Sequence, residues 1–232
     1  MRKALGATAV VLAILTGVAV SGPAMAAGKA KAVRKPPVAA AVEPPSATVL
    51  ALAKWARTTD DNHDLPFIVI DKKAAEVFVF DADGKKLGGT PALLGLAFGD
   101  NSTPGVGDRE LSDIAPQDRT TPAGRFQAAY GPGPGKEKVF WVDYGTAISL
   151  HPVITSNPKE RRPQRLRSPS VADNRITFGC INVPARFYSQ VVHKTFGKSR
   201  GIVYILPEVE PLGEVFPAFQ LQLASQGNAA QP

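Results

Sequence analysis

Cys180 is the only cysteine in the 232-residue sequence and lies in the run RITFGCIN, residues 175–182. Without a second cysteine, an intramolecular disulfide is excluded. A lone cysteine is either a small buried apolar residue or a nucleophile. Because a free thiol is little ionised at neutral pH, a nucleophilic Cys180 needs a base or a positive charge beside it.

The sequence contains three histidines that could supply this base. His63 lies in a charged turn, where a solvated surface role is expected. His193 lies near the end of a predicted helix, where a cation favours the helix dipole. His151 ends an apolar strand and is followed by Pro152, which stops that strand. A satisfied core histidine is the alternative, but with the cysteine motif downstream we interpret His151 as the base of Cys180.

Gly179 directly precedes the thiol. A residue without Cβ permits a sharp turn and a close approach of substrate backbone. The backbone N–H groups around Cys180 could then form an oxyanion hole. An ordinary β-turn glycine is the alternative interpretation.

The N-terminal residues 1–26 have the pattern of a secretory signal peptide. Arg2 and Lys3 precede an apolar run over residues 4–20, and Ala24-Met25-Ala26 forms a small-residue cleavage site. A retained membrane anchor is the alternative. After cleavage we expect a soluble protein in the periplasm or cell envelope, with no stable membrane span.

Residues 27–46 are rich in Ala, Pro, Lys and Val without a regular period, which predicts a disordered linker. The whole sequence carries a net charge of +7, of which the signal peptide contributes two. This basic balance suits an anionic polymer such as the cell wall, or a membrane surface. Nucleic acid is not expected as a partner, because the exported chain shows no stacking-aromatic motif.

Residues 47–215 are predicted to form one mainly-β domain, followed by a flexible tail over residues 216–232. Ser46 can cap a helix that runs to Arg57. The chain shows no βαβ alternation, which favours a β-sandwich or barrel with a few short helices. We expect strands at 67–71, 76–80, 93–98, 125–130, 138–142, 146–150 and 201–206, a polar loop at 99–121 and a helix at 184–194.

Two motifs together resemble the L,D-transpeptidase (YkuD-like) catalytic domain. One is Gly179-Cys180-Ile181-Asn182 with His151 upstream. The other is Thr121-Pro122-Ala123-Gly124-Arg125-Phe126, which matches a Thr-Pro-x-Gly-x-Phe element. The likeness covers residues 66–206 and includes an opening hairpin over residues 67–84.

The resemblance implies a β-sandwich or barrel-like fold and a role in cell-wall cross-linking or remodelling, and so in cell shape. The thiolate would attack the peptide bond before the terminal D-alanine of a peptidoglycan stem. An amine of a second stem, or of a lipoprotein, would then resolve the thioester. Water as the acceptor would make the protein an L,D-carboxypeptidase instead. No cofactor or metal is implied.

Carried over residue by residue, Cys180 is the nucleophile, His151 the base and Gly179 part of the oxyanion turn. Thr177 replaces the family's serine as a hydroxyl, and Asn182 is a positioning or loop-bracing group. The family has a histidine where this chain has Phe178. An apolar ring beside the thiol removes solvent without adding charge, which predicts a raised thiol pKa.

A basic segment, residues 159–168, separates His151 from Cys180. Arginine suits bidentate recognition of carboxylates, which stem peptides carry. We therefore expect a cap beside the cleft; a solvated loop is the alternative. The candidate substrate-binding residues are Arg161, Arg162, Arg165, Arg167 and Arg175.

Other classes fit less well. In papain-like amidases the cysteine precedes the histidine, whereas His151 precedes Cys180. Sortase-like enzymes need an arginine on a strand after the nucleophile, and Arg186 and Arg200 are expected on a helix and in a turn. A catalytically degenerate peptidoglycan-binding protein stays open as an alternative. We expect a monomer.

Overall fold

The computed structural model describes residues 43–133 and 138–229. The expected signal peptide and residues 27–42 of the linker lie outside these ranges. The last linker residues are described: the Glu43 N–H donates to Glu76 Oε1 at 3.0 Å, and Ser46 begins a helix. Within the described ranges, the helices are all too short or too polar to cross a membrane.

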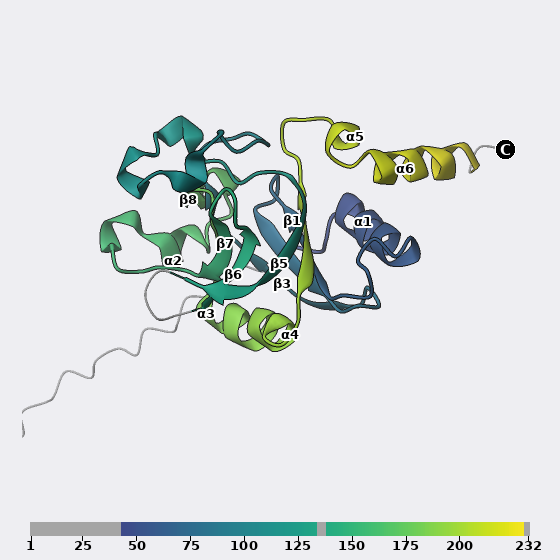
Figure 1. Ribbon diagram of the computed structural model, residues 1–232, viewed down its shortest axis with the longest axis horizontal. Helices are drawn as coiled ribbons and strands as arrows, with labels where there is room; N and C mark the ends of the chain where they lie inside the picture. Colours follow the sequence, from purple (N-terminus) through teal and green to yellow (C-terminus); the bar gives the residue numbers. More distant parts are fainter. Residues whose placement is uncertain (1–42, 134–137, 230–232) are drawn as a thin grey trace, which may run out of the picture. The chain divides into compact units, whose positions relative to one another are not determined.

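The described chain is mainly β, as predicted, and its principal sheet has eight strands in the order β3-β2-β1-β10-β5-β6-β7-β9 (Figure 1). Most neighbours are antiparallel, but β1 pairs with β10, and β7 with β9, in parallel. The strands are β1 (Phe67–Asp71), β2 (Glu76–Phe80), β3 (Lys86–Pro91), β5 (Gly124–Pro132), β6 (Lys138–Asp143), β7 (Ile148–Pro152), β9 (Ile181–Val183) and β10 (Gly201–Leu206).

The two edges of this sheet meet at Asn182. The chain leaving edge strand β3 reaches Leu93, which exchanges two backbone hydrogen bonds with Asn182 of the opposite edge strand β9, at 2.8 and 2.9 Å. Beside this bridge, β4 (Leu94–Gly95) pairs in parallel with β8 (Arg175–Thr177). The sheet is therefore nearly closed and barrel-like, which confirms the predicted fold class.

Strand β1 is buried on both faces, which explains its continuous apolar sequence. Ile68 and Ile70 join a core cluster with the helical segment after β9, whereas Phe67 and Val69 join a second cluster with the N-terminal helix. That helix, α1 (Ala47–Thr58), begins as predicted: the Ser46 hydroxyl accepts a hydrogen bond from the Val49 N–H at 3.3 Å.

The remaining elements are short. The helix expected at 184–194 consists of α3 (Ala185–Phe187), a π-helical turn η6 (Tyr188–Val192) and α4 (His193–Phe196). The strand expected at 93–98 is only β4, with an isolated bridge from Ala97 to Thr120 beyond it. The backbone of residues 119–121 lies so close to Gly95 that a Cβ there would sit 2.3 Å from Arg119 O. Single 3-10 turns are η1 (Val106–Asp108), η2 (Leu111–Asp113), η3 (Pro116–Asp118), η4 (Pro158–Glu160) and η5 (Val171–Asn174).

The C-terminal segment differs from the flexible tail expected from residue 216. The chain forms α5 (Leu212–Val215) and α6 (Pro217–Ala229). Phe219 is 1% exposed, and its ring centroid lies 5.6 Å from that of Trp55 in α1. Phe216 is also buried, against Tyr204 of β10. Burial of these two rings makes the segment part of the domain, which therefore extends beyond residue 215.

We predict that Phe219→Ala lowers the free energy of unfolding by about 3–5 kcal/mol, because it removes a buried ring and leaves a cavity against Trp55. The matched control is Leu221→Ala on the same helix, where the side chain is 73% exposed and the expected change is within about 0.5 kcal/mol. Urea denaturation measures both. Equal stability of the Phe219 variant and the wild type would show that α6 does not contribute to the core.

Candidate active site

Cys180 lies half-buried in the turn between β8 and β9. Thr177, at the end of β8, closes this turn with one hydroxyl. Its Oγ1 donates to Cys180 O at 2.7 Å and accepts from the Gly179 N–H at 3.2 Å. The residue expected to replace the family's serine thus braces the backbone that carries the thiol.

Gly179 has a backbone conformation that favours glycine, with φ of 122°. Space is also limiting, because a Cβ at this position would lie 2.6 Å from Ile148 Cδ1 and 2.7 Å from Thr120 O. The sequence-based expectation of a sharp turn before the thiol agrees with this geometry. The Gly179 N–H already donates to Thr177 Oγ1, so Gly179 affects this turn through its shape.

The thiol has two polar neighbours on the strand β7 side. Cys180 Sγ lies 3.6 Å from Ser149 Oγ and 3.6 Å from Ala147 O. Burial by itself raises the pKa of the Cys180 thiol, but interaction with His151 and hydrogen bonding to Ser149 outweigh burial, so its pKa lies below the ordinary value. The site therefore stabilises the thiolate, the form in which a cysteine attacks.

Ser149 was not among the residues singled out from the sequence. A signal for it was available: Ser149 and His151 are two residues apart on one strand, so their side chains leave the same face. Ser149 is buried and reaches the thiol from that face.

His151 is the penultimate residue of β7, which includes Pro152, and lies directly opposite Asn182 of β9 in the parallel register. Its Nδ1 lies 2.8 Å from Pro152 O and its Nε2 lies 3.1 Å from Asn182 Nδ2. Because a carbonyl oxygen can only accept, Nδ1 carries the proton and donates to Pro152. Nε2 is then unprotonated and accepts from the Asn182 N–H.

Asn182 is 1% exposed and is held on both sides. Its backbone pairs with Leu93 at the closure of the sheet, and its Oδ1 accepts from Arg162 Nη1 at 2.8 Å. Asn182, which the sequence predicts to be a positioning residue, thus connects His151 to Arg162 of the basic segment.

The candidate arginines of the basic segment take separate positions. Arg162, in α2 (Arg162–Arg165), contacts Asn182 and pairs with Glu160. Arg161 and Arg165 line a cavity of about 330 Å³, and Arg167 lines a different one. Ser168 lines both cavities, so Arg167 lies near the cavity of Arg161 and Arg165.

Arg175 lies in the interior rather than in a cleft. Its guanidinium donates to Glu208 and to the backbone oxygen of Lys72, and its Cζ lies 4.6 Å from the centre of the Phe98 ring. The side chain is therefore engaged in the fold, unlike the solvent-accessible arginine expected for binding an anionic substrate.

Phe178 stacks with an arginine: Arg119 Cζ lies 3.9 Å from its ring centre. The prediction that the Phe178 ring leaves Cys180 with a raised pKa is wrong, because His151 and Ser149 outweigh desolvation of the thiol.

Of the other histidines, His193 contacts the Tyr130 ring in the core-facing helix, and His63 lies in a turn with φ of 51°. The described residues hold no group of three or more His, Cys, Asp or Glu placed to bind a metal.

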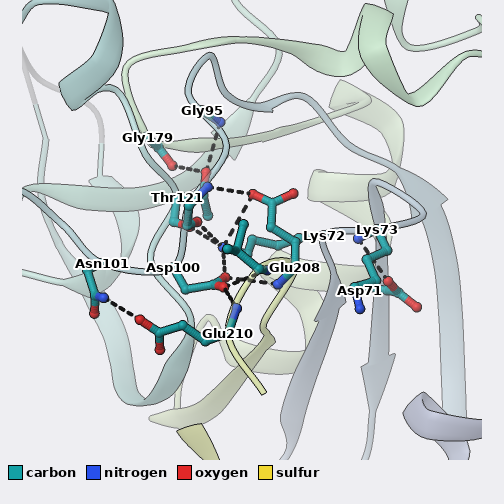
Figure 2. A network of polar contacts seen from close by, with 12 residues as sticks. Asp71, Lys72, Lys73, Gly95, Asp100, Asn101, Thr121, Gly179, Glu208 and Glu210 are labelled. Carbon is teal, nitrogen blue, oxygen red and sulfur yellow. Dashed lines mark hydrogen bonds and ion pairs between the residues drawn. The ribbon is translucent and has the colours of Figure 1, made fainter. Parts of the chain in front are cut away.

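A buried ionic network connects to the cysteine turn through Thr121 and Gly179 (Figure 2). Lys72 Nζ lies 2.6 Å from Asp100 Oδ1 and 3.6 Å from Glu208 Oε1, with all three side chains almost fully buried. The ammonium also donates to Thr121 O at 2.8 Å. The Thr121 hydroxyl in turn donates to Gly179 O at 2.7 Å, so the chain of contacts runs from Lys72 to the residue before the thiol.

Burial and charge act in opposite directions in this network. Burial lowers the pKa of Lys72, although Asp100 and Glu208 favour its charged form. Burial also raises the pKa of Asp100, but hydrogen bonds from Lys72 and from backbone N–H groups of residues 208–210 outweigh it, so the net pKa lies below the ordinary value. Asp100 therefore stabilises the fold above the pKa of an unfolded aspartate, and this contribution is lost as the pH falls through its lowered pKa.

Comparison with known proteins gives similarity in structure only. No model of a known protein family matches the chain, and no curated protein matches it. Among solved structures, the helical cell shape determining protein Pgp2 from Campylobacter jejuni is 18% identical with a TM-score of 0.42, covering 63% of this chain and 49% of that one.

Two further solved structures are L,D-transpeptidases. The enzyme from Mycobacterium smegmatis is 18% identical with a TM-score of 0.34, over 60% of this chain and 58% of that one. The catalytic domain from Enterococcus faecium is 20% identical with a TM-score of 0.33, over 61% of this chain and 97% of that domain. The chain spans about half the length of Pgp2 and less than two thirds of the mycobacterial enzyme. At these identities and TM-scores, the likeness assigns neither family nor activity to this chain.

We predict that Cys180 reacts with iodoacetamide at a lower pH than a free thiol, whose pKa is about 8.5, because its pKa is lowered. Ser149→Ala removes a hydrogen bond to the thiolate and should move the midpoint of the rate–pH profile up by about half a unit to one unit. Ser199→Ala, in an exposed turn, is the control. A wild-type midpoint above that of a free thiol would contradict the prediction.

Lys72→Met is expected to lower the free energy of unfolding by about 3–5 kcal/mol, because it leaves Asp100 and Glu208 buried without their cation. Lys73→Met changes the adjacent, exposed lysine and should have little effect. Chemical denaturation of both variants measures the difference. Similar losses from the two substitutions would show that the buried pair contributes nothing beyond surface charge.

Proposed function

We propose that this chain is an exported L,D-transpeptidase-like acyltransferase that acts on peptidoglycan stem peptides through a thioester on Cys180. The observation that carries the proposal is the thiol itself: its pKa is lowered by His151 and Ser149, and it lies in a glycine-containing turn. The sequence motifs around Cys180 and Thr121 add the substrate class, and the signal-peptide pattern of residues 1–26 adds export to the periplasm or cell envelope.

In the first half-reaction, the Cys180 thiolate attacks the carbonyl carbon of the peptide bond before the terminal D-alanine. The C–N bond then breaks, and His151, whose Nε2 took the proton of the Cys180 thiol when the thiolate formed, passes this proton to the departing amine of D-alanine. A thioester joins the rest of the stem to Sγ. Thr177 and Gly179 fix the turn that presents Sγ to the substrate, and Asn182 orients His151.

In the second half-reaction, an amine of another stem attacks the thioester carbonyl. His151 accepts the proton of this amine, the C–S bond breaks and the thiolate is regenerated. Water in place of the amine would give carboxypeptidase activity. Arg161 and Arg165, which share a cavity, and the nearby Arg167 are the side chains we propose for contact with stem carboxylates.

The test is turnover of purified tetrapeptide muropeptides. Cys180→Ser should abolish D-alanine release while keeping the fold, because the substitution is nearly isosteric. His151→Ala should lower kcat by about a hundredfold or more, since proton transfer is lost. His193→Ala, which changes a histidine in the core-facing helix, is the control and should retain activity.

Intact-mass analysis after incubation with a carbapenem tests the thiol independently. A single adduct on the wild type, absent from Cys180→Ser, is the expected result. No adduct and no D-alanine release from the wild type would contradict the enzyme and favour a peptidoglycan-binding protein. Release of D-alanine without cross-linked dimers would identify water as the acceptor.

A further inference from the structure

Three side chains from separate parts of the chain form a continuous line of hydrogen bonds at the site. Arg162 Nη1 lies 2.8 Å from Asn182 Oδ1, and Asn182 Nδ2 lies 3.1 Å from His151 Nε2. His151 Nδ1 continues the line to Pro152 O at 2.8 Å. Arg162 belongs to α2 in the basic segment, Asn182 to β9 and His151 to β7.

Arg162 determines which way the Asn182 amide faces. The two ends of an amide have nearly the same shape, so the orientation is decided by the hydrogen-bond partners. A guanidinium has donors only, and it must therefore face the amide oxygen. Arg162 is itself held by its pair with Glu160, and a reversed amide would place two donors against each other in a buried position.

This orientation has a consequence for His151. With Asn182 Oδ1 turned toward Arg162, the Nδ2–H group points at His151 Nε2. Neutral imidazole protonated on Nδ1 fits this arrangement, because Nε2 then accepts. An imidazolium would instead present a second donor, Nε2–H, to the donor of Asn182. A proton on Nε2 would therefore face the Asn182 N–H rather than an acceptor.

The titratable and charged groups that face this line come from several elements. Cys180 approaches from the turn before β9, Arg162 from α2 and Glu160 from η4. The buried Lys72, Asp100 and Glu208 connect to the cysteine turn through Thr121 and Gly179. Of these groups, it is Arg162 that bonds the partner of His151 directly.

We propose that Arg162 is a positioning residue: by fixing the amide of Asn182 with its N–H toward Nε2, it keeps the proton of His151 on Nδ1 and limits how far His151 can stabilise the Cys180 thiolate. The basic segment thereby acts on the thiol through Asn182, in addition to any contact with substrate. The proposal rests on the proposed function only in taking His151 as the base of Cys180.

The first experiment is the pH dependence of Cys180 alkylation by iodoacetamide in the Arg162→Met variant. Once Arg162 no longer binds Oδ1, Asn182 can turn and accept a hydrogen bond from the imidazolium. The midpoint should then move down by about one pH unit relative to the wild type. Removal of a nearby positive charge alone would have the opposite sign, because it destabilises the thiolate.

The matched control is Lys159→Met, which removes one positive charge from an exposed side chain of the same segment. Its profile should stay at the wild-type midpoint or move slightly up. An upward shift in Arg162→Met similar to that of Lys159→Met would overturn the proposal, since Arg162 would then act only as a distant charge.

The second experiment observes His151 directly by ¹⁵N NMR of the imidazole in the full-length protein. The wild type should show neutral imidazole protonated on Nδ1. In the nearly isosteric Asn182→Asp variant, a carboxylate oxygen replaces Nδ2, so Nε2 should become protonated at the same pH. An Nε2-protonated ring in the wild type, or an unchanged ring in Asn182→Asp, would overturn the proposal.

The two experiments separate failure of the proposal from failure of the proposed function. If Cys180 resists alkylation in every variant, Cys180 is not an activated nucleophile and the proposed function fails. The His151 spectra still decide whether Arg162 and Asn182 determine which imidazole nitrogen carries the proton. If Cys180 is alkylated as predicted for the wild type but the spectra do not respond to Asn182→Asp, the proposed function stands and the positioning role of Arg162 is rejected.

Discussion

The buried ammonium of Lys72 is the interaction on which the cysteine turn depends. It is 0% exposed, and a buried charge of this kind is tolerated only when it is paired and fully hydrogen-bonded. Asp100 and Glu208 supply the charge, and the carbonyls of Gly99 and Thr121 accept its other bonds. These groups come from the β1–β2 turn, the long loop after β4 and the segment after β10. One cation thus links three parts of the chain that are distant in sequence, and through Thr121 it connects to Gly179, the residue before the thiol.

The residue that closes the sheet, Asn182, also holds the candidate site together. Asn182 pairs through its backbone with Leu93 to join the sheet edges, and through its side chain with His151 and Arg162. A slip of one residue between β7 and β9 would turn His151 and Ser149 to the opposite face of the sheet. Register is therefore as much a requirement for the chemistry as the residue types, and the bridge at Leu93 helps to enforce it.

The sequence predicted the parts of the molecule that depend on local pattern. Strands 67–71, 76–80 and 201–206 each contain a run of four or more apolar residues, and the pairing of Cys180 with His151 follows from motif and order. Lys72 was not predicted because, in a Lys-Lys turn between strands, it resembles a surface residue. Likewise, the contact of Arg162 with Asn182 depends on how the basic segment folds back. The sequence of α6 has little apolar periodicity, and the burial of Phe219 and of the preceding Phe216 depends on contacts with distant residues. Such features arise from tertiary contacts between residues far apart in sequence.

The position of β10 has a consequence for the order in which the protein folds. This strand comes last in the chain yet lies in the middle of the sheet, where it hydrogen-bonds both β1 and β5. Strands β1, β2 and β3 are synthesised early, but they can pair with the rest of the sheet only after residues 201–206 have been synthesised. Contacts of such long sequence separation slow folding, because loop entropy is lost before they form. A chain that ends before β10 lacks the strand that joins β1 to β5, and so cannot form the complete sheet.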